Sequence, residues 1–232
     1  MADRHRPRRG SMGFSPRKRS IRQFPRISTW PSSNSSEIRV QGFAGWKAGM
    51  THILMRDNNP NSTSAGQEIR KAVTIVETPP MTVLAVRGYK ATPYGLQTAG
   101  EIWSDISSKG PDNLSPRFAN QTKGERDEEE GRKPSKRGGR IPSRATAPSE
   151  DSINSLKSQD LVEVRLIVCT QPYMVRSIPT KTPEIMEVGL EGGDTASKLD
   201  WGLEKLGGQI DLQDVFSQGQ EVDVVGVTKG KG

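Results

Sequence analysis

Short stretches of alternating apolar and polar residues recur along the chain from residue 37 onward, and they predict β-strands. In these stretches β-branched side chains tend to occupy every second position, and Gly, Pro or Asp ends the run. The predicted strands are residues 37–45, 52–57, 71–80, 81–89, 162–172, 184–190 and 221–230. Seven such runs against a single helix predict a mainly β fold, either a barrel or a sandwich with excursions.

One segment, near residues 194–207, has the period of a helix instead. Its leucines recur at i, i+4 and i+7 on one face, at Leu199, Leu203 and Leu206. Asp194 or Thr195 can cap its start, and a Gly-Gly pair follows its last leucine. We therefore expect one helix among the later strands.

Residues 104–158 show neither period and predict a polar, charged insert. An acidic run, 125–130, is followed at once by the basic stretch 131–144. We interpret the acidic half as a solvated loop. The basic half, which contains Arg137 and Arg140, either neutralises that loop or follows a phosphate backbone, and its Gly, Pro and Ser spacing leaves both interpretations open.

Positive charge is concentrated at the N-terminus. Residues 1–30 contain nine Arg and Lys side chains and one acid, a net charge of +8, whereas the formal net charge of the whole chain is +7. The remainder is therefore nearly neutral, at −1. Prolines recur too closely in this segment for a continuous helix, at Pro7, Pro16, Pro25 and Pro31. We expect an extended basic arm over residues 1–35.

The composition of the arm favours nucleic acid as its partner. Arginine, which pairs with phosphate through a planar fork, outnumbers lysine eight to one, and aromatic rings on which bases can stack are interleaved with the cations. A solubilising tail and an organellar transit peptide are the alternatives, although the prolines argue against the amphipathic helix of a transit peptide. The candidate binding residues are Arg4, His5, Arg6, Arg8, Arg9, Phe14, Arg17, Lys18, Arg19, Arg22, Arg26 and Trp30.

Several kinds of chemistry are excluded by the sequence. No apolar run approaches the roughly 20 residues of a membrane span. The chain has a single cysteine, Cys169, which permits no internal disulfide and fits a reduced intracellular compartment. Cys169, His5 and His52 together do not have the spacing of zinc ligands. No nucleotide-binding or hydrolase motif is present, and residues 226–232 lack the spacing of a phosphate loop. We expect no catalytic residue, metal, cofactor or small-molecule substrate.

Six segments, in order along the chain, resemble the archaeal and eukaryotic type of the large-ribosomal-subunit protein L-three family. The most specific are HRPRRGSMGFSPRKR (5–19) and QGFAGWKAGMTHILMRD (41–57). The others are VETPPMTVLAVRGY (76–89), TQP (170–172), IPTKTPEIMEVG (178–189) and VDVVGVTKGKG (222–232). The resemblance implies a translation-protein-type β-barrel, built from residues 36–103 and 159–232 around the insert.

The same resemblance implies a function without catalysis. Family members bind 23S-type rRNA, support early assembly of the large subunit and the region around the peptidyl transferase centre, and contact neighbouring large-subunit proteins in cytoplasmic ribosomes. A non-ribosomal translation factor or RNA chaperone that uses the same barrel is the alternative.

Carried over to this chain, the resemblance adds residues outside the arm. Lys47 and His52 lie in a glycine-rich segment expected to approach rRNA, where Gly42, Gly45 and Gly49 would permit tight turns and close backbone approach. Lys229 and Lys231 lie where the chain of family members enters a long central extension. Because family members continue past this point, we expect a truncated chain, an incomplete barrel and an unpaired last strand.

Overall fold

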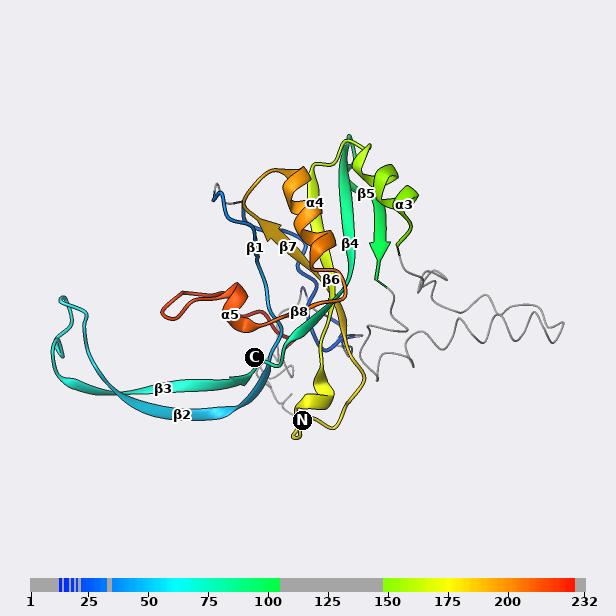
Figure 1. Ribbon diagram of the computed structural model, residues 1–232. Helices are drawn as coiled ribbons and strands as arrows, with labels where there is room; N and C mark the ends of the chain where they lie inside the picture. The colour runs from blue at the N-terminus through cyan, green and yellow to red at the C-terminus, as the bar shows by residue number, and fades with distance from the viewer. Residues whose placement is uncertain are drawn as a thin grey trace, which may run out of the picture. The chain divides into compact units, whose positions relative to one another are not determined.

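The computed structural model describes residues 13, 15–16, 18, 20, 22–32, 35–104 and 148–227. The chain divides into two compact units. One comprises Met1–Thr29 and Gln218–Gly232, and the other comprises Trp30–Ser217. The second unit contains all the helices and strands described below (Figure 1).

The second unit is built around an antiparallel sheet of six strands. Its order is β1-β7-β6-β4-β5, and β8 also pairs with β4. The strands are β1 (Arg39–Val40), β4 (Met81–Thr92), β5 (Gly95–Trp103), β6 (Glu163–Cys169), β7 (Ile185–Glu191) and β8 (Gln209–Ile210). Strand β4 is therefore central, because it has neighbours on both of its edges.

The residues of β4 explain this central place. From Met81 to Val86 every side chain is buried, so neither face of this part of the strand is exposed to solvent. An apolar run of this kind requires cover on both faces of the sheet. One face carries the larger cluster, which includes Val83 and Leu166, and the other carries a smaller cluster with Leu84 and Cys169.

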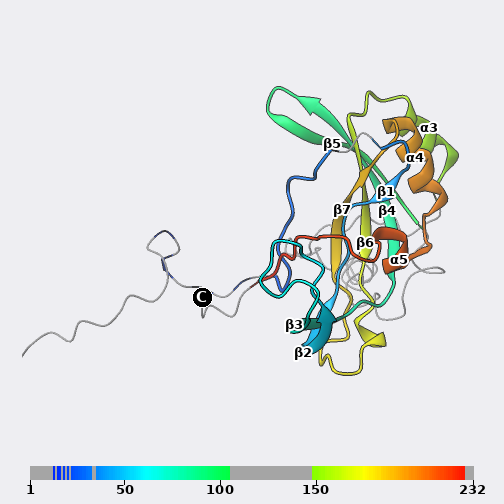
Figure 2. The ribbon, with the colours of Figure 1, turned by 90° about the vertical axis from the view of Figure 1, so that its left-hand side faces the viewer.

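Helices cover the face of the larger cluster (Figure 2). They are α3 (Glu150–Lys157), α4 (Thr195–Glu204) and α5 (Leu212–Val215), and a 3₁₀ turn, η3 (Pro172–Met174), follows β6. Each of the three α-helices contributes a buried side chain to the cluster: Leu156, Leu199 and Val215. Burial of these side chains, more than intrinsic propensity, stabilises such short helices.

A long hairpin forms a second, separate sheet. Strand β2 (Trp46–Arg56) pairs antiparallel with β3 (Glu68–Glu77), and Figure 1 draws them as a curved two-stranded ribbon. Among the strands of the described residues, these two pair only with each other. Almost every side chain of the hairpin is therefore at least partly exposed.

The prediction of a mainly β fold is confirmed, but the described strands do not close a barrel. Strands β1 and β5 form the two ends of an open sheet, and the hairpin strands do not bridge them. The helix predicted near 194–207 is confirmed as α4, and Gly207, with φ of 77°, follows it. Strands β3, β4, β6 and β7 overlap the predicted strands.

Four sequence predictions need correction. Within residues 37–45 only Arg39–Val40 is a strand, and the run predicted at 52–57 is the end of the longer β2. The predicted strand 221–230 is not formed over its described part, 221–227, because its valines have no strand partner there. The insert 104–158 was predicted to be irregular throughout, yet it ends in α3.

Helix α3 was missed because serines and charges obscure its period. Ser149 caps its start, and its hydroxyl oxygen accepts a hydrogen bond from the backbone N–H of Ser152 at 3.3 Å. Leu156 is buried against the sheet. One capping serine and one buried leucine are thus enough to order this turn of the chain once the sheet is present.

We expect Cys169 to be chemically inert in the folded chain. Its side chain is buried, and burial raises the pKa of the thiol to about 12. A thiol with this pKa holds roughly a thousandth of the thiolate of an ordinary cysteine at neutral pH, and thiolate is the reactive form. Mass spectrometry should show no alkylation by iodoacetamide under native conditions and rapid alkylation in strong denaturant. Equal rates in the two conditions would contradict the burial.

Candidate nucleic-acid interface

Three of the predicted arm cations lie in the described part of the first unit. Lys18, Arg22 and Arg26 are all exposed, and residues 22–29 form neither helix nor strand. A small local turn lies here, in which the Ser20 hydroxyl donates to the Arg22 carbonyl at 2.6 Å and accepts from the Arg22 amide at 3.3 Å. The three cations are therefore accessible to a large anionic partner.

Most of the other predicted binding residues lie outside the described residues. They are Arg4, His5, Arg6, Arg8, Arg9, Phe14, Arg17, Arg19, Arg137, Arg140, Lys229 and Lys231.

Trp30 has a different place from the one predicted. Its ring is half-buried in the second unit and packs against the larger core cluster. A β-carbon added at Gly189 would lie 2.7 Å from Cγ of Trp30, and one at Gly42 would lie 3.1 Å from the ring. Trp30 thus covers backbone of its own unit, with glycine required beneath it, and its stacking on bases stays a prediction.

The three predicted glycines differ from one another. The predicted tight turns are not found, because Gly42 and Gly45 lie in an irregular stretch without turns before β2 and Gly49 lies within β2. At Gly42 and Gly45 the close approach is made by the chain itself, because a β-carbon at Gly45 would lie 2.6 Å from Cγ1 of Val76. At Gly49 a β-carbon would meet nothing within 4 Å, and its approach to RNA stays a prediction.

A β-bulge sorts the side chains of the hairpin between its two faces. The pairing register shifts between Lys47 and Gly49, where Lys47 lies opposite Val76 and Gly49 opposite Ile75. Paired residues point to the same face, and successive residues of a strand point to opposite faces. The extra residue therefore brings Lys47 onto the face of the even-numbered residues of β2, which include His52 and Arg56.

Arg70 completes this face and was missed by sequence reasoning. Its guanidinium lies 3.0 Å from Nδ1 of His52. Because a guanidinium has donors only, Arg70 donates and Nδ1 accepts, which leaves the imidazole neutral with its proton on Nε2. Neither the alternation of residues nor the net charge indicates this pair, since His52 and Arg70 meet only through the hairpin register. We name the face with Lys47, His52, Arg56 and Arg70 the cationic face.

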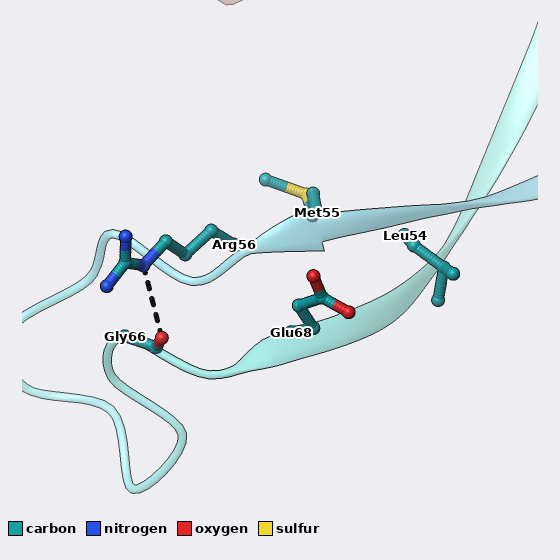
Figure 3. Close-up of a pocket in the computed structure, with 5 residues that line it drawn as sticks. All are labelled: Leu54, Met55, Arg56, Gly66 and Glu68. Atoms are coloured by element: carbon teal, nitrogen blue, oxygen red, sulfur yellow. Dashed lines mark hydrogen bonds between the residues drawn. The ribbon is translucent and has the colours of Figure 1, made fainter.

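At the tip, Arg56 supports the turn. Its Nε donates to the carbonyl of Gly66 at 3.1 Å, and Gly66 has a positive φ of 78° (Figure 3). Asp57 follows, and its carboxylate accepts from Ser64 at 2.6 Å. The hydrogen bond from the Ser64 hydroxyl is the main cause that lowers the pKa of Asp57. The hydrogen bond from the backbone N–H of Asn59 lowers it further.

The opposite face of the hairpin is mainly aliphatic. Its residues are Thr51, Ile53, Met55, Ile69, Lys71, Val73 and Ile75. Lys71 is its single cation in this stretch, and it contributes a small electrostatic lowering of the pKa of Asp57. The hairpin thus places three of its four cations on one face, although that face also carries Met50, Leu54, Ala72 and Val76.

Two arginines of the main sheet form ion pairs with glutamates, whereas those of the hairpin form none among the described residues. Arg87 pairs with Glu101 at 2.8 Å and with Glu187 at 3.3 Å, and Arg165 pairs with Glu163 at 2.7 Å. Arg165 also lies over the ring of Tyr89, 4.7 Å from its centroid. We name these two arginines and their three glutamates the ion lattice. Its charges satisfy one another on the sheet face opposite the helices.

Tyr89 belongs to this lattice as a donor. Its hydroxyl donates to Glu187, and burial, followed by this hydrogen bond, raises the pKa of Tyr89. The lattice is a structural feature, because each of its carboxylates is held by a cation of the same sheet.

The described part of the chain lacks two further kinds of feature. No helix there has the length and apolar character needed to cross a membrane. Within the same residues, no group of three or more His, Cys, Asp and Glu side chains is arranged to hold a metal ion.

Comparison with known proteins identifies the family. The family described as Ribosomal protein L3 matches residues 1–232. The chain belongs to the ribosomal protein L3 family. It is 42% identical over 228 residues to the large ribosomal subunit protein uL3 of Archaeoglobus fulgidus, which covers 98% of this chain and 60% of that protein.

Two other archaeal members of the ribosomal protein L3 family give the same result. The uL3 protein of Methanothrix harundinacea is 40% identical over 232 residues, covering 100% of this chain and 62% of that protein. The uL3 protein of Haloarcula marismortui is 39% identical over 229 residues, covering 98% and 61% respectively. This member of the ribosomal protein L3 family thus spans about 60% of the length of the curated relatives it matches.

Replacement of Gly189 by alanine should destabilise the second unit. The new β-carbon would lie 2.6 Å from Oε1 of Gln41 and 2.7 Å from Cγ of Trp30, so one of them must move. Such overpacking costs about 1–3 kcal/mol of unfolding free energy. Urea denaturation of Gly189→Ala and of Gly49→Ala, where the space is open, measures the difference. We expect Gly49→Ala to change stability by less than about 0.5 kcal/mol, and equal losses for both variants would contradict the proposed packing of Trp30.

Proposed function

We propose that this chain is a structural constituent of the large ribosomal subunit and binds 23S-type rRNA. The observation that carries the proposal is the match to the ribosomal protein L3 family along the whole chain. The relatives named above are large ribosomal subunit proteins. The concentration of positive charge in residues 1–30 supports a polyanionic partner independently of the family.

The mode of binding that this composition supports is backbone recognition. Arginine and lysine side chains that neutralise phosphates release condensed counterions, and they position a protein without reading the bases. Exposed Lys18, Arg22 and Arg26 are the arm cations whose accessibility the structure describes. The other candidate residues named in the sequence analysis are proposed on their charge and their place in the family motifs alone.

Further parts of the proposal concern the assembled particle. We propose that neighbouring large-subunit proteins are partners, that the chain supports early assembly and the region around the peptidyl transferase centre, and that it acts in cytoplasmic ribosomes. We also propose that it has no catalytic activity of its own. The ion lattice supports this last point for the main sheet, because its carboxylates are engaged with arginines.

Deletion of residues 1–27 should weaken binding to 23S-type rRNA far more than deletion of residues 125–130. The first deletion removes nine cations, and the second removes five acids and Arg126. If all nine cations neutralise phosphates, the magnitude of the slope of log K against log salt should fall by roughly six to eight. Filter binding over a salt series measures both quantities.

Co-sedimentation with the large subunit in high salt provides the control for non-specific attachment. The full chain is expected to remain with the subunit. Equal losses of rRNA affinity from the two deletions would show that the arm is not the main electrostatic contact, and failure of the full chain to bind rRNA would overturn the proposed function.

A further inference from the structure

The cationic face of the hairpin presents exposed donors that form no ion pair among the described residues. Lys47, His52, Arg56 and Arg70 lie on it, and all four side chains are exposed. Its single acid is Glu68, which lies opposite Arg56 at the tip. Among the described residues, none of the three cations of this face forms an ion pair, whereas Arg39, Arg87 and Arg165 of the main sheet each pair with glutamate.

The contact between Arg70 and His52 holds the guanidinium toward solvent as a donor. One N–H of Arg70 is used by Nδ1 of His52 at 3.0 Å, and the remaining N–H groups of Arg70 and Nε2–H of His52 need acceptors. A carboxylate partner would have cancelled the charge of Arg70, but the neutral imidazole does not. The pair therefore orients a cation while leaving its full charge for an external anion.

Resting on the proposed function, we propose that the cationic face of β2–β3 binds the phosphate backbone of rRNA through Lys47, His52 and Arg70. The opposite, aliphatic face with Lys71 does not. Arginine suits this role because its planar fork matches two phosphate oxygens. The hairpin is thus a second rRNA contact, and it lies in a different unit of the chain from the basic arm.

The ligand is a phosphate backbone and not a set of bases. Apart from the imidazole of His52, which is held by Arg70, no aromatic side chain occupies the paired positions of the cationic face from Lys47 to Arg56. Trp46, the aromatic residue of β2, pairs with Glu77 and points to the other face. From Lys47 to Arg56 the strand extends about 30 Å at roughly 3.3 Å per residue, enough to reach several successive phosphates. We therefore expect affinity with a salt dependence and with little preference for sequence.

The test compares two adjacent cations that point to opposite faces. Arg70→Gln and Lys71→Gln remove the same charge from neighbouring positions of β3, and both side chains are exposed. Each full-length variant is titrated against a 23S-type rRNA transcript over a salt series. We expect Arg70→Gln to bind about fivefold to tenfold more weakly and to lower the salt slope by about 0.7–0.9, as for one lost phosphate contact. Lys71→Gln should bind within about twofold of the unchanged chain, because its charge faces away from the backbone.

Two further variants separate binding from folding. Lys47→Gln, at the other end of the same face, should lower the salt slope by a similar amount. Arg70→Lys should keep most of the slope and lose part of the affinity, because it retains the charge without the fork. Protection of Cys169 from alkylation reports whether the main sheet of each variant is folded, and protection of the β2–β3 amides from hydrogen exchange reports the hairpin.

The outcomes also distinguish this inference from the proposed function. Equal effects of Arg70→Gln and Lys71→Gln, or no effect of Arg70→Gln and Lys47→Gln in folded protein, would overturn the cationic face as a binding site. If binding then still depends on residues 1–27, the proposed function stands without the hairpin. If the unchanged chain does not bind the transcript, both proposals fail.

Discussion

Burial of the first half of β4 on both faces is the constraint on which the rest of the second unit depends. Six consecutive buried residues, from Met81 to Val86, need a strand on each edge and a layer on each face. The edges are supplied by β5, β6 and β8, and the helices supply one layer. Beyond Val86, the face of β4 toward the helices stays apolar, because a β-carbon at Gly88 would lie 2.9 Å from the Leu161 side chain. The other face of β4 becomes polar at Arg87. The ion lattice begins at that residue, so it continues the second layer where the apolar cluster ends.

The hairpin follows from how the chain enters β4. Pro79 and Pro80 separate β3 from β4, and proline cannot donate the hydrogen bond that a continuing ladder would need. Strands β2 and β3 pair with each other, and the hairpin is inserted in the chain between β1 and β4 of the main sheet. A two-stranded hairpin is only marginally stable by itself. Any partner that binds its ordered form more tightly than its frayed form will stabilise it by mass action.

Sequence reasoning succeeded where one period dominates a segment. The valine-rich runs of β4, β6 and β7 and the leucine stripe of α4 were recognisable because burial and period agree there. The start of β2 was missed because Ala48 and Gly49 interrupt its alternation, and the bulge at the same place cannot be derived from one strand alone. Trp30 was assigned to the arm on composition, although its ring depends on Gly189, a residue far away in sequence. The family motifs indicated Lys47 and His52, but only the register of the hairpin adds Arg70.

Net charge is a poor guide to the cations that can bind RNA in this chain. Outside residues 1–30 the formal charges nearly cancel, and on that evidence the remainder of the chain would have no reason to approach a polyanion. The structure shows that some of these cations are neutralised by a neighbouring carboxylate and others are not. Arg87 and Arg165 are held by glutamates of their own sheet, and an RNA phosphate would have to compete with those carboxylates for them. Arg70 is held by a neutral imidazole, so its charge remains available. The difference arises because the hairpin register places histidine beside Arg70, whereas the sheet register places glutamate beside Arg87.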